Sequence, residues 1–400
     1  MCLELGKIAA DPKVPQANRR MFLRVLGAAA ALGTTAACSA APPAAGAFPS
    51  VSLNDPASAR TRLVLLGTAG GPALYGGSRF GVSTAVAYDN RVYLVDLGLG
   101  SLQRLRQSSL VSSDPAASML ANVRGIFFTH MHSDHLADWP ALYATGPSNI
   151  MGREDPSPIA VRGPGPRGTL PRVFPANRPE PAIVNPDDPT PGIVGMSTYL
   201  EKAWSTDLND RVRDNNSMLP TDLFQIQDID LSGTWNVDPE GIPPRLPKPI
   251  QVLQDGEVTV TATLVDHRPA APAFAYRFDT PDGSIVVSGD TTVSSNLIEL
   301  SQNVDYLVHE VIDLEFVERI TATLPESMGG PLRKHLIEAH TTIEQVGRDV
   351  AEPARAKNLV LTHLAPATNP TSRWELARNG YSGNLIVGED LLEIPVNPNS

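Results

Sequence analysis

Short apolar runs separated by polar turns dominate the chain from residue 60 to about residue 130. A strand is expected where about four to eight β-branched or aromatic residues lie between turn residues. The segments that fit are Arg62–Leu66, Val82–Tyr88, Arg91–Val95 and Gly125–Phe128. Ser101 is expected to cap a helix that runs to about Gln107.

The same pattern returns after residue 256, and Thr342 with Gln345 forms a capping box that opens a second helix. Strands alternate with single helices in this order, which predicts an α/β or α+β fold built in layers. The strands expected here are Glu257–Val265, Phe274–Phe278, Ser284–Ser288, Val304–Glu310 and Asn358–Thr362.

Between these halves, the segment 146–250 has a different texture, because residues 147–250 hold 18 of the 37 prolines. Proline removes a backbone donor, so this density argues against a regular sheet or helix layer. Within it, Met196–Asn215 has a helical pattern. We interpret 146–250 as an insertion that wraps one end of the domain near the active site.

The N-terminal segment has the pattern of an export signal rather than of a fold. Arg19 and Arg20 precede a short apolar run that ends at Ala36-Ala37-Cys38, which resembles a twin-arginine signal. Residues 1–37 are therefore expected to be removed on export to the periplasm or another extracytoplasmic place. Cys38 resembles a lipidation site that would anchor the chain to a membrane, although an ordinary cleavage site is the alternative. Residues 38–58 are a flexible tether and 59–400 the folded domain.

Charge and cysteine content narrow the function classes. The net charge is −11 with 32 basic and 43 acidic residues, and it becomes −14 without residues 1–37. Because non-specific nucleic-acid binding depends on Lys and Arg, this balance argues against a dedicated polyanion binder. The two cysteines, Cys2 and Cys38, lie near the N-terminus. A metal in the folded domain must therefore be held by His, Asp or Glu.

Three of the eight histidines lie within six residues, in His130-Met131-His132-Ser133-Asp134-His135. The segment follows a predicted strand, and strand-end loops are places where ligands converge. Imidazole and carboxylate groups suit zinc-like ions, each of which needs three or four ligands. A solvated loop with chance histidines is the alternative, and the density of the cluster favours the metal site.

Single residues that follow later strands can complete such a site. His267, Asp290 and His363 each lie just past, or at, the end of a predicted buried strand. A lone histidine at such a place is usually a structural turn residue. Three of these positions in a chain that already has the cluster reverse that expectation.

Further short motifs accompany these residues in a fixed order. They are Leu66-Gly67-Thr68, Asp96-Leu97-Gly98, Asp266-His267, Ser288-Gly289-Asp290-Thr291, Val308-His309-Glu310, Glu338-Ala339-His340-Thr341 and Leu361-Thr362-His363. With the histidine cluster, the set resembles the metallo-β-lactamase fold, and within it the ribonuclease Z and zinc arylsulfatase branch. The resemblance covers roughly residues 60–145 and 255–395 and implies an αββα four-layer sandwich, with the Pro-rich insertion outside it.

The resemblance also implies roles for single residues. It assigns His130, His132 and His267 to one divalent metal ion, and Asp134, His135 and His363 to a second, with Asp290 bridging the two. Zinc is the expected metal. Asp96 would orient a ligand imidazole, and His340 would be a general acid held by Glu310. A metal-bridging hydroxide would be the nucleophile, and Asp134 belongs to the catalytic set. His309 is interpreted as structural, and His335 has no assigned role.

The expected activity is hydrolysis of a small phosphodiester or an aryl sulfate ester. Family members that process tRNA bind it with a basic arm, which is inserted between the positions that correspond to His267 and Asp290. Only 23 residues separate His267 from Asp290 here, so no arm fits. With the acidic charge and the predicted export, this predicts a small-molecule substrate and no nucleic acid. Tyr199, Trp204 or Trp235 of the insertion could contact a leaving group.

Other functions stay open from the sequence. They are a lactonase-type carbonyl ester hydrolase on the same fold, a tRNA 3′-processing-like nuclease, and a non-enzymatic metal- or solute-binding lipoprotein. The sequence does not fix the oligomeric state, for which a homodimer is one option.

Overall fold

The computed structural model describes residues 59–72, 77–112, 118–176 and 178–397, which form one compact unit. The expected export signal, Cys38 and the tether lie outside these residues. Among the described helices, none is long and apolar enough to cross a membrane.

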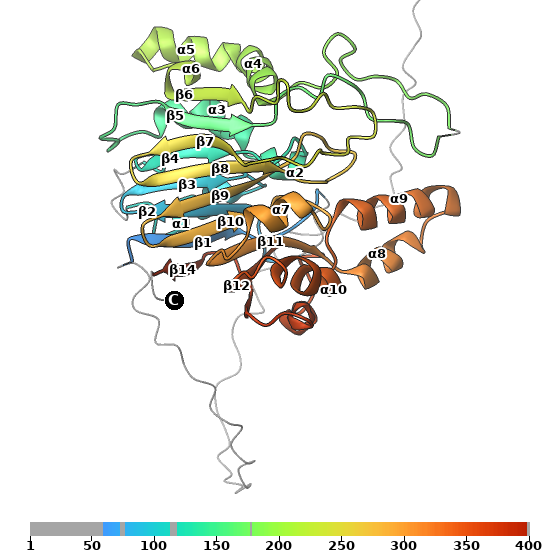
Figure 1. Ribbon diagram of the computed structural model, residues 1–400. Coiled ribbons are helices and arrows are strands. Elements are labelled where there is room, and N and C mark those ends of the chain that lie inside the picture. The colour runs from blue at the N-terminus through green and yellow to red at the C-terminus, as the bar shows by residue number, and fades with distance from the viewer. Residues whose placement is uncertain (1–58, 73–76, 113–117, 177, 398–400) are drawn as a thin grey trace, which may run out of the picture. The chain divides into compact units, whose positions relative to one another are not determined.

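Two seven-stranded sheets form the centre of this unit (Figure 1). The first has the order β14-β1-β2-β3-β4-β5-β6 and the second β13-β12-β11-β10-β9-β8-β7. The strands of the first sheet are β1 Thr61–Gly67, β2 Ser83–Tyr88, β3 Arg91–Val95, β4 Val123–Phe127, β5 Ile159–Gly163, β6 Phe224–Asp228 and β14 Leu392–Val396. Those of the second are β7 Ile250–Asp255, β8 Val258–Leu264, β9 Phe274–Thr280, β10 Gly283–Val287, β11 Tyr306–Ile312, β12 Asn358–Ala365 and β13 Asn384–Val387.

Three apolar clusters show that the sheets and helices form four layers. One cluster lies between the sheets and contains Phe127, Tyr276 and Phe278 with aliphatic side chains from both. A second joins the first sheet to α1, α3 and α4, and a third joins the second sheet to α7, α10 and the turns after it. The predicted αββα sandwich is confirmed.

The helices connect strands along the chain, and they lie mainly on the outer faces of the two sheets. They are α1 Ser101–Gln107, α2 Ser133–Leu136, α3 Trp139–Thr145, α4 Ile193–Ala203, α5 Ser205–Asn215, α6 Pro220–Leu223, α7 Ser295–Leu300, α8 Leu314–Thr321, α9 Glu326–Ala339, α10 Ile343–Gln345 and α11 Thr371–Trp374. Short 3₁₀ turns cover Gly146–Ser148 and Glu375–Arg378, and a π-helical segment covers Val346–Ala351.

The first helix begins differently from the expectation. Ser101 is its first helical residue, and Gly100 occupies the capping position with a positive φ of 81°. The Asp138 carboxylate accepts hydrogen bonds from the backbone N–H groups of Gly100 and Leu102, at 3.0 and 2.9 Å. The side chain of Asp138, which is distant in sequence, therefore caps the N-terminus of α1, the role that was expected for Ser101.

The Pro-rich segment is also more regular than expected. It contributes β5 and β6, which extend the first sheet in parallel, and its helical pattern is divided at Trp204 into α4 and α5. The expectation that this segment holds no sheet is wrong, because its prolines lie between the strands rather than in them. Arg167 braces the segment through the backbone carbonyls of Asp238 and Pro239, and it joins the segment to the loop after His267 through the carbonyl of Pro269.

Candidate metal centre

The histidine cluster lies directly after β4, at one end of the first sheet. The backbone enters it through the buried Thr129, and Asp134 and His135 lie in the short helix α2. His130 and His135 are buried, whereas His132 is half-buried.

The ends of the second sheet's strands bring the remaining candidate ligands to the same place. His267 follows β8, Asp290 follows β10, and His363 lies within β12. Gly289, just before Asp290, has a φ of 60°, and a Cβ atom there would lie 2.7 Å from Thr129 Cβ. Only glycine fits this close approach of the two sheets, which places Asp290 beside the cluster.

Asp290 lies at the centre of the group. Its Oδ2 atom lies 3.3 Å from His135 Nε2, 3.4 Å from His363 Nε2, 3.8 Å from His267 Nε2 and 4.0 Å from His130 Nε2. One carboxylate therefore faces four imidazole nitrogens that are carried by three strand ends, those of β4, β8 and β12.

Hydrogen bonds behind the rings fix which nitrogens face the centre. Asp96 Oδ2 lies 2.7 Å from His135 Nδ1 and also accepts from the Thr129 hydroxyl at 2.8 Å. The Ala339 carbonyl lies 2.8 Å from His267 Nδ1. With Nδ1 donating in both rings, the Nε2 lone pairs of His135 and His267 are directed at the centre.

These residues fit divalent cations. Ligand atoms of His130, His132 and His267 lie within 4.8 Å of one another, and so do those of Asp134, His135, Asp290 and His363. Several polar atoms of these residues are buried and have no hydrogen-bond partner, among them His130 Nε2, His135 Nε2 and Asp290 Oδ1. Lone pairs that converge without donors between them are the arrangement that a cation satisfies. These two groups match the ligand sets implied by the sequence resemblance. Two further groups contain His340, one with His267 and Asp290 and one with Glu310 and His363, so the assignment of ligands, and of His340 as a non-ligand, stays a prediction.

Burial and mutual charge set the protonation of the group. Burial lowers the pKa of His130, His132 and His267, that of His132 to about 4, so these rings are neutral at pH 7. Burial alone would raise the pKa of Asp290, but the neighbouring imidazoles of His363 and His135 hold it well below its ordinary value. Burial opposes the charged form of His135, but Asp290 and Asp96 raise its pKa. A cation there would displace a proton.

His340 lies at the edge of this group, where α9 ends. Its Nδ1 atom lies 3.1 Å from Glu310 Oε1, and 3.8 Å from Asp290 Oδ2. Burial of this ring lowers its pKa, but the carboxylates of Glu310 and Asp290 outweigh burial and raise it to about 9. Glu310 also accepts from the backbone N–H groups of Thr291 and Thr341, which hold its carboxylate in place.

The remaining two histidines differ from each other. His309 is fully buried, and its Nδ1 atom lies 2.7 Å from the carbonyl of Glu310, away from the ligand groups. His335, which the sequence left without a role, lies on α9 and lines the cavity over the centre. No spacing or motif pointed to His335, because only the packing of α9 brings it to the cavity.

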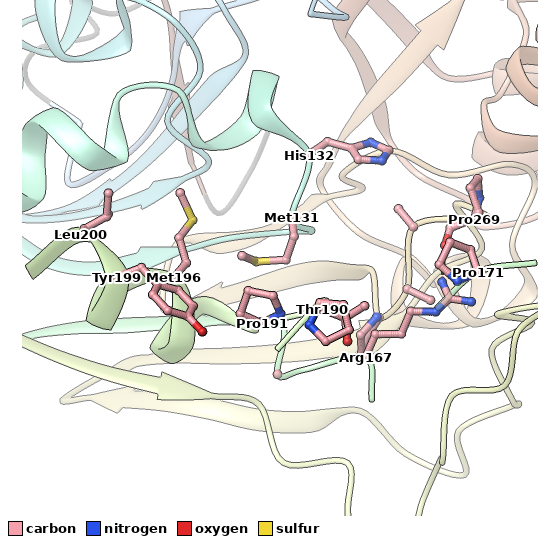
Figure 2. A pocket seen from close by; sticks show the side chains of 15 residues that line it. Met131, His132, Arg167, Pro171, Thr190, Pro191, Met196, Tyr199, Leu200 and Pro269 are labelled. Atoms are coloured by element: carbon pink, nitrogen blue, oxygen red, sulfur yellow. The ribbon is translucent and has the colours of Figure 1, made fainter. Parts of the chain in front are cut away.

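Three cavities border the centre. A cavity of about 650 Å³ is lined by Asp134 together with Arg79 and Phe80, and two more adjoin the ligand groups. One of about 420 Å³ is lined by Asp134, Asp290, His340 and His363 and by apolar side chains of α8 and α9. We call it the hairpin cavity, after the α8–α9 pair. The other, of about 530 Å³, is lined by residues of the Pro-rich segment and the loop after His267 (Figure 2). We call it the insertion cavity.

Of the three aromatic residues expected to contact a leaving group, the structure brings one to the second cavity. Tyr199 lines the insertion cavity. Trp204 is 40% exposed at the break between α4 and α5, and Trp235 packs against the core between the sheets. The apolar residues of α8 and α9 were not anticipated, because α9 contains Gly329, Gly330 and Pro331 and has no clear helical pattern.

The two stacked sheets form an αββα architecture, and candidate metal ligands gather at their shared edge. A comparison with family sequences agrees, since residues 76–313 match the Metallo-beta-lactamase superfamily. The chain belongs to this superfamily and is a metal-dependent hydrolase of it.

More specific relatives are ribonucleases Z. The chain is 26% identical over 340 residues to the Ribonuclease Z of Mycobacterium bovis (strain BCG / Pasteur 1173P2), covering 84% of this chain and 98% of that protein. The Ribonuclease Z of Mycobacterium tuberculosis (strain ATCC 25618 / H37Rv) is 25% identical over the same length and coverage. The expected resemblance to the ribonuclease Z branch is confirmed.

Solved structures share the fold. Human tRNase Z, short form, has a TM-score of 0.50 and 17% identity, covering 84% of this chain and 99% of that chain. A long form RNase Z from yeast has a TM-score of 0.52 and 14% identity, covering 86% of this chain and 43% of that chain.

These relatives correct one expectation. The exclusion of nucleic acid as a partner is wrong, because the relatives that cover most of the chain are ribonucleases. Net charge describes the whole surface, whereas the binding of a phosphodiester depends on the groups around the reacting phosphorus. The acidic balance therefore could not carry that exclusion.

Proposed function

We propose that this protein hydrolyses phosphodiesters, with His130, His132, His267, Asp134, His135, His363 and Asp290 holding two divalent ions, most simply zinc. The observation that carries the proposal is the His340–Glu310 pair, which lies beside the ligand groups and lines the same cavity. A metal-binding protein without a reaction has no need of an imidazole that is held by a carboxylate and lies outside the proposed ligand set.

Each residue has a distinct part in the reaction. Divalent ions bound there would supply Lewis-acid chemistry, polarising the phosphoryl group and activating water. Asp96 and the Ala339 carbonyl keep the rings of His135 and His267 in the orientation that binds metal. His340 holds a proton beside the reacting group and gives it to the departing alkoxide or aryloxide. Glu310 positions the His340 ring and stabilises its charged form.

Ribonuclease Z-like cleavage of RNA is a second candidate, and the relatives' coverage of 84% of the chain favours it. It uses the same bond chemistry on a larger substrate. An aryl sulfate ester would also suit a cationic centre with a proton donor. A lactone is neutral and releases no aryloxide, so it would make less use of both features.

A panel assay distinguishes these candidates. Zinc-reconstituted protein is offered a bis-aryl phosphate, an aryl sulfate, a lactone and a tRNA precursor with a 3′ trailer, and Asp290→Asn serves as the matched inactive control. The proposal predicts that phosphodiester hydrolysis is the fastest reaction and is lost in Asp290→Asn. Hydrolysis of the lactone alone, or of no compound, would contradict it.

We also propose that residues 1–37 direct export through a twin-arginine pathway. The support is the pair Arg19 and Arg20 before a short apolar run. Substituting both arginines with lysine should leave unprocessed precursor in the cytoplasm, as measured by fractionation and mass. Normal processing of the double variant would refute the proposal. Cys38→Ala tests lipidation separately, through loss from the membrane fraction.

A further inference from the structure

The hairpin cavity and the insertion cavity meet at one residue. His132 lines both, with the metal-binding groups on the hairpin side and the Pro-rich segment on the other. In Figure 2 the segment that carries His132 also carries Met131, and the two side chains extend in different directions from it. A molecule bound at the centre therefore has an adjoining space on each side.

The hairpin cavity has an apolar wall opposite the ligand groups. Ile312 and Phe316 are buried, and Ile320, Leu332 and Leu336 are half-buried. Among the described residues, none of these five side chains belongs to the three apolar clusters of the core. A wall of this kind, beside the reacting groups, is suited to an apolar group of a ligand.

The insertion cavity is likewise apolar near the centre. Met131, Met196, Tyr199 and Leu200 line it together with several prolines. Arg167 is the one permanently charged residue of its described lining, and its guanidinium donates to the carbonyls of Asp238, Pro239 and Pro269. Arg167 therefore closes the wall rather than offering a counter-charge to a ligand.

We infer that the substrate is a phosphodiester with an uncharged apolar group on each of its two ester oxygens, one lying in each cavity. This inference rests on the proposed function. The hairpin cavity takes the departing group, because His340 lines that cavity and does not line the other. The insertion cavity takes the group that stays on phosphorus. The described lining of these two cavities contains no lysine, and its one arginine is committed to backbone carbonyls. The cationic residues Arg172, Arg268 and Lys334 line a separate cavity that touches both.

Two substrates with one leaving group separate the two sides. Bis(4-nitrophenyl) phosphate and methyl 4-nitrophenyl phosphate both release nitrophenolate, and they differ only in the group that is retained. Burial of an aromatic ring gives the bis-aryl ester about a 10- to 100-fold higher kcat/KM in the wild type.

Substitutions in each cavity then show which of the two ester groups that cavity binds. Tyr199→Ala should lower kcat/KM for the bis-aryl ester about tenfold and far less for the methyl ester. Trp204→Ala is its control, because Trp204 is an aromatic residue of nearly equal exposure outside the cavity. Leu336→Ala should lower kcat/KM about equally for both esters, and the exposed Met328 on the same helix provides the control Met328→Ala. Melting temperatures of all variants show whether each is folded.

The outcomes are distinguishable. Equal turnover of both esters by the wild type would overturn the inference while leaving phosphodiester hydrolysis in place. A reversed pattern, with Leu336→Ala selective for the bis-aryl ester, would overturn the assignment of sides. RNA cleaved faster than the bis-aryl ester and unaffected by both variants would overturn the apolar substrate class. No hydrolysis of any diester would refute the proposed function itself.

Discussion

Glu310 and His340 form a buried pair, with the Oε1 atom of the carboxylate 3.1 Å from Nδ1 of the imidazole. Glu310 lies near the end of β11 and His340 at the end of α9, so the pair joins the second sheet to the helical hairpin. The carboxylate fixes one ring nitrogen and leaves Nε2 as the atom that can exchange a proton with a ligand.

The rate loss on removing His340 should depend on the pKa of the leaving group. His340→Ala should slow an ester with a high-pKa alcohol leaving group by about 10²-fold or more. A nitrophenolate ester needs little protonation and should be slowed much less. Glu310→Gln should show the same pattern more mildly, because it only orients and stabilises the ring. Steady-state kinetics on a leaving-group series measure this. Equal slowing across the series would show that His340 binds substrate instead, and loss of metal would make it a ligand.

Asp96 should act on the metal through His135. The Asp96 carboxylate accepts from the backbone N–H and the hydroxyl of Thr129 and also faces His135 Nδ1. In Asp96→Asn one of the two oxygens becomes an NH₂ group, which cannot accept, so at least one of these contacts is lost. We expect zinc affinity about 10- to 100-fold weaker, as measured by competition with a chelator. Asp138→Asn is the control, because Asp138 caps α1 and lies outside the ligand groups. It should reduce thermal stability without changing zinc affinity, and a similar loss in both variants would contradict the orienting role of Asp96.

Much of this arrangement was predictable from the sequence. The inner strands were found within three residues at each end, because buried β-branched runs such as Arg91–Val95 end at clear turns. The candidate ligands could be grouped from the sequence because His130, His132 and His135 are close together, and because the others follow strands.

The walls of the two cavities were not predictable. The apolar side chains of Phe316, Leu332 and Leu336 have no local signal, since only the pairing of α8 and α9 directs them to the centre. The strand β5 was missed because the prolines around it dominated the pattern. Local sequence therefore identified the chemistry, while tertiary packing determines what can lie beside it.

Arg167 should hold the insertion cavity in shape. Arg167→Met removes the donors to three backbone carbonyls, which should lower the free energy of unfolding by about 1–3 kcal/mol. It should also raise KM for a bis-aryl phosphate while zinc content stays the same. Arg172→Met is the control, because Arg172 pairs with an exposed glutamate at the surface of the same segment. Thermal melts with kinetics test this, and unchanged stability in Arg167→Met would refute the clamp.

A pH-dependent clasp holds the segment after β12. Asp313 accepts from the Arg373 guanidinium at 2.7 and 3.0 Å and from the Asn369 amide at 2.7 Å. Burial alone would raise the pKa of Asp313, but these donors lower it below its ordinary value. A carboxyl with a lowered folded-state pKa stabilises the fold above its unfolded pKa, near 3.9, and this stabilisation is lost as pH falls towards the folded value.

Arg373→Met should therefore lower the free energy of unfolding by about 2 kcal/mol at pH 7. The difference from the wild type should shrink as the pH is lowered below about 4. Denaturant unfolding at several pH values measures it, with Arg348→Met as the control because the exposed Arg348 pairs with its sequence neighbour Asp349. A difference that is independent of pH would show that Asp313 does not titrate as part of this clasp.

The metal centre around Asp290 is the feature on which the proposed activity depends most. Elemental analysis of zinc-reconstituted protein is the direct measurement, made on the wild type, Asp290→Ala and His363→Ala. Asp290 faces both ligand groups, so we predict two zinc ions per chain in the wild type and loss of both in Asp290→Ala. His363→Ala should mainly weaken one. Only trace metal in the wild type, or equal partial loss in both variants, would contradict the two-metal centre.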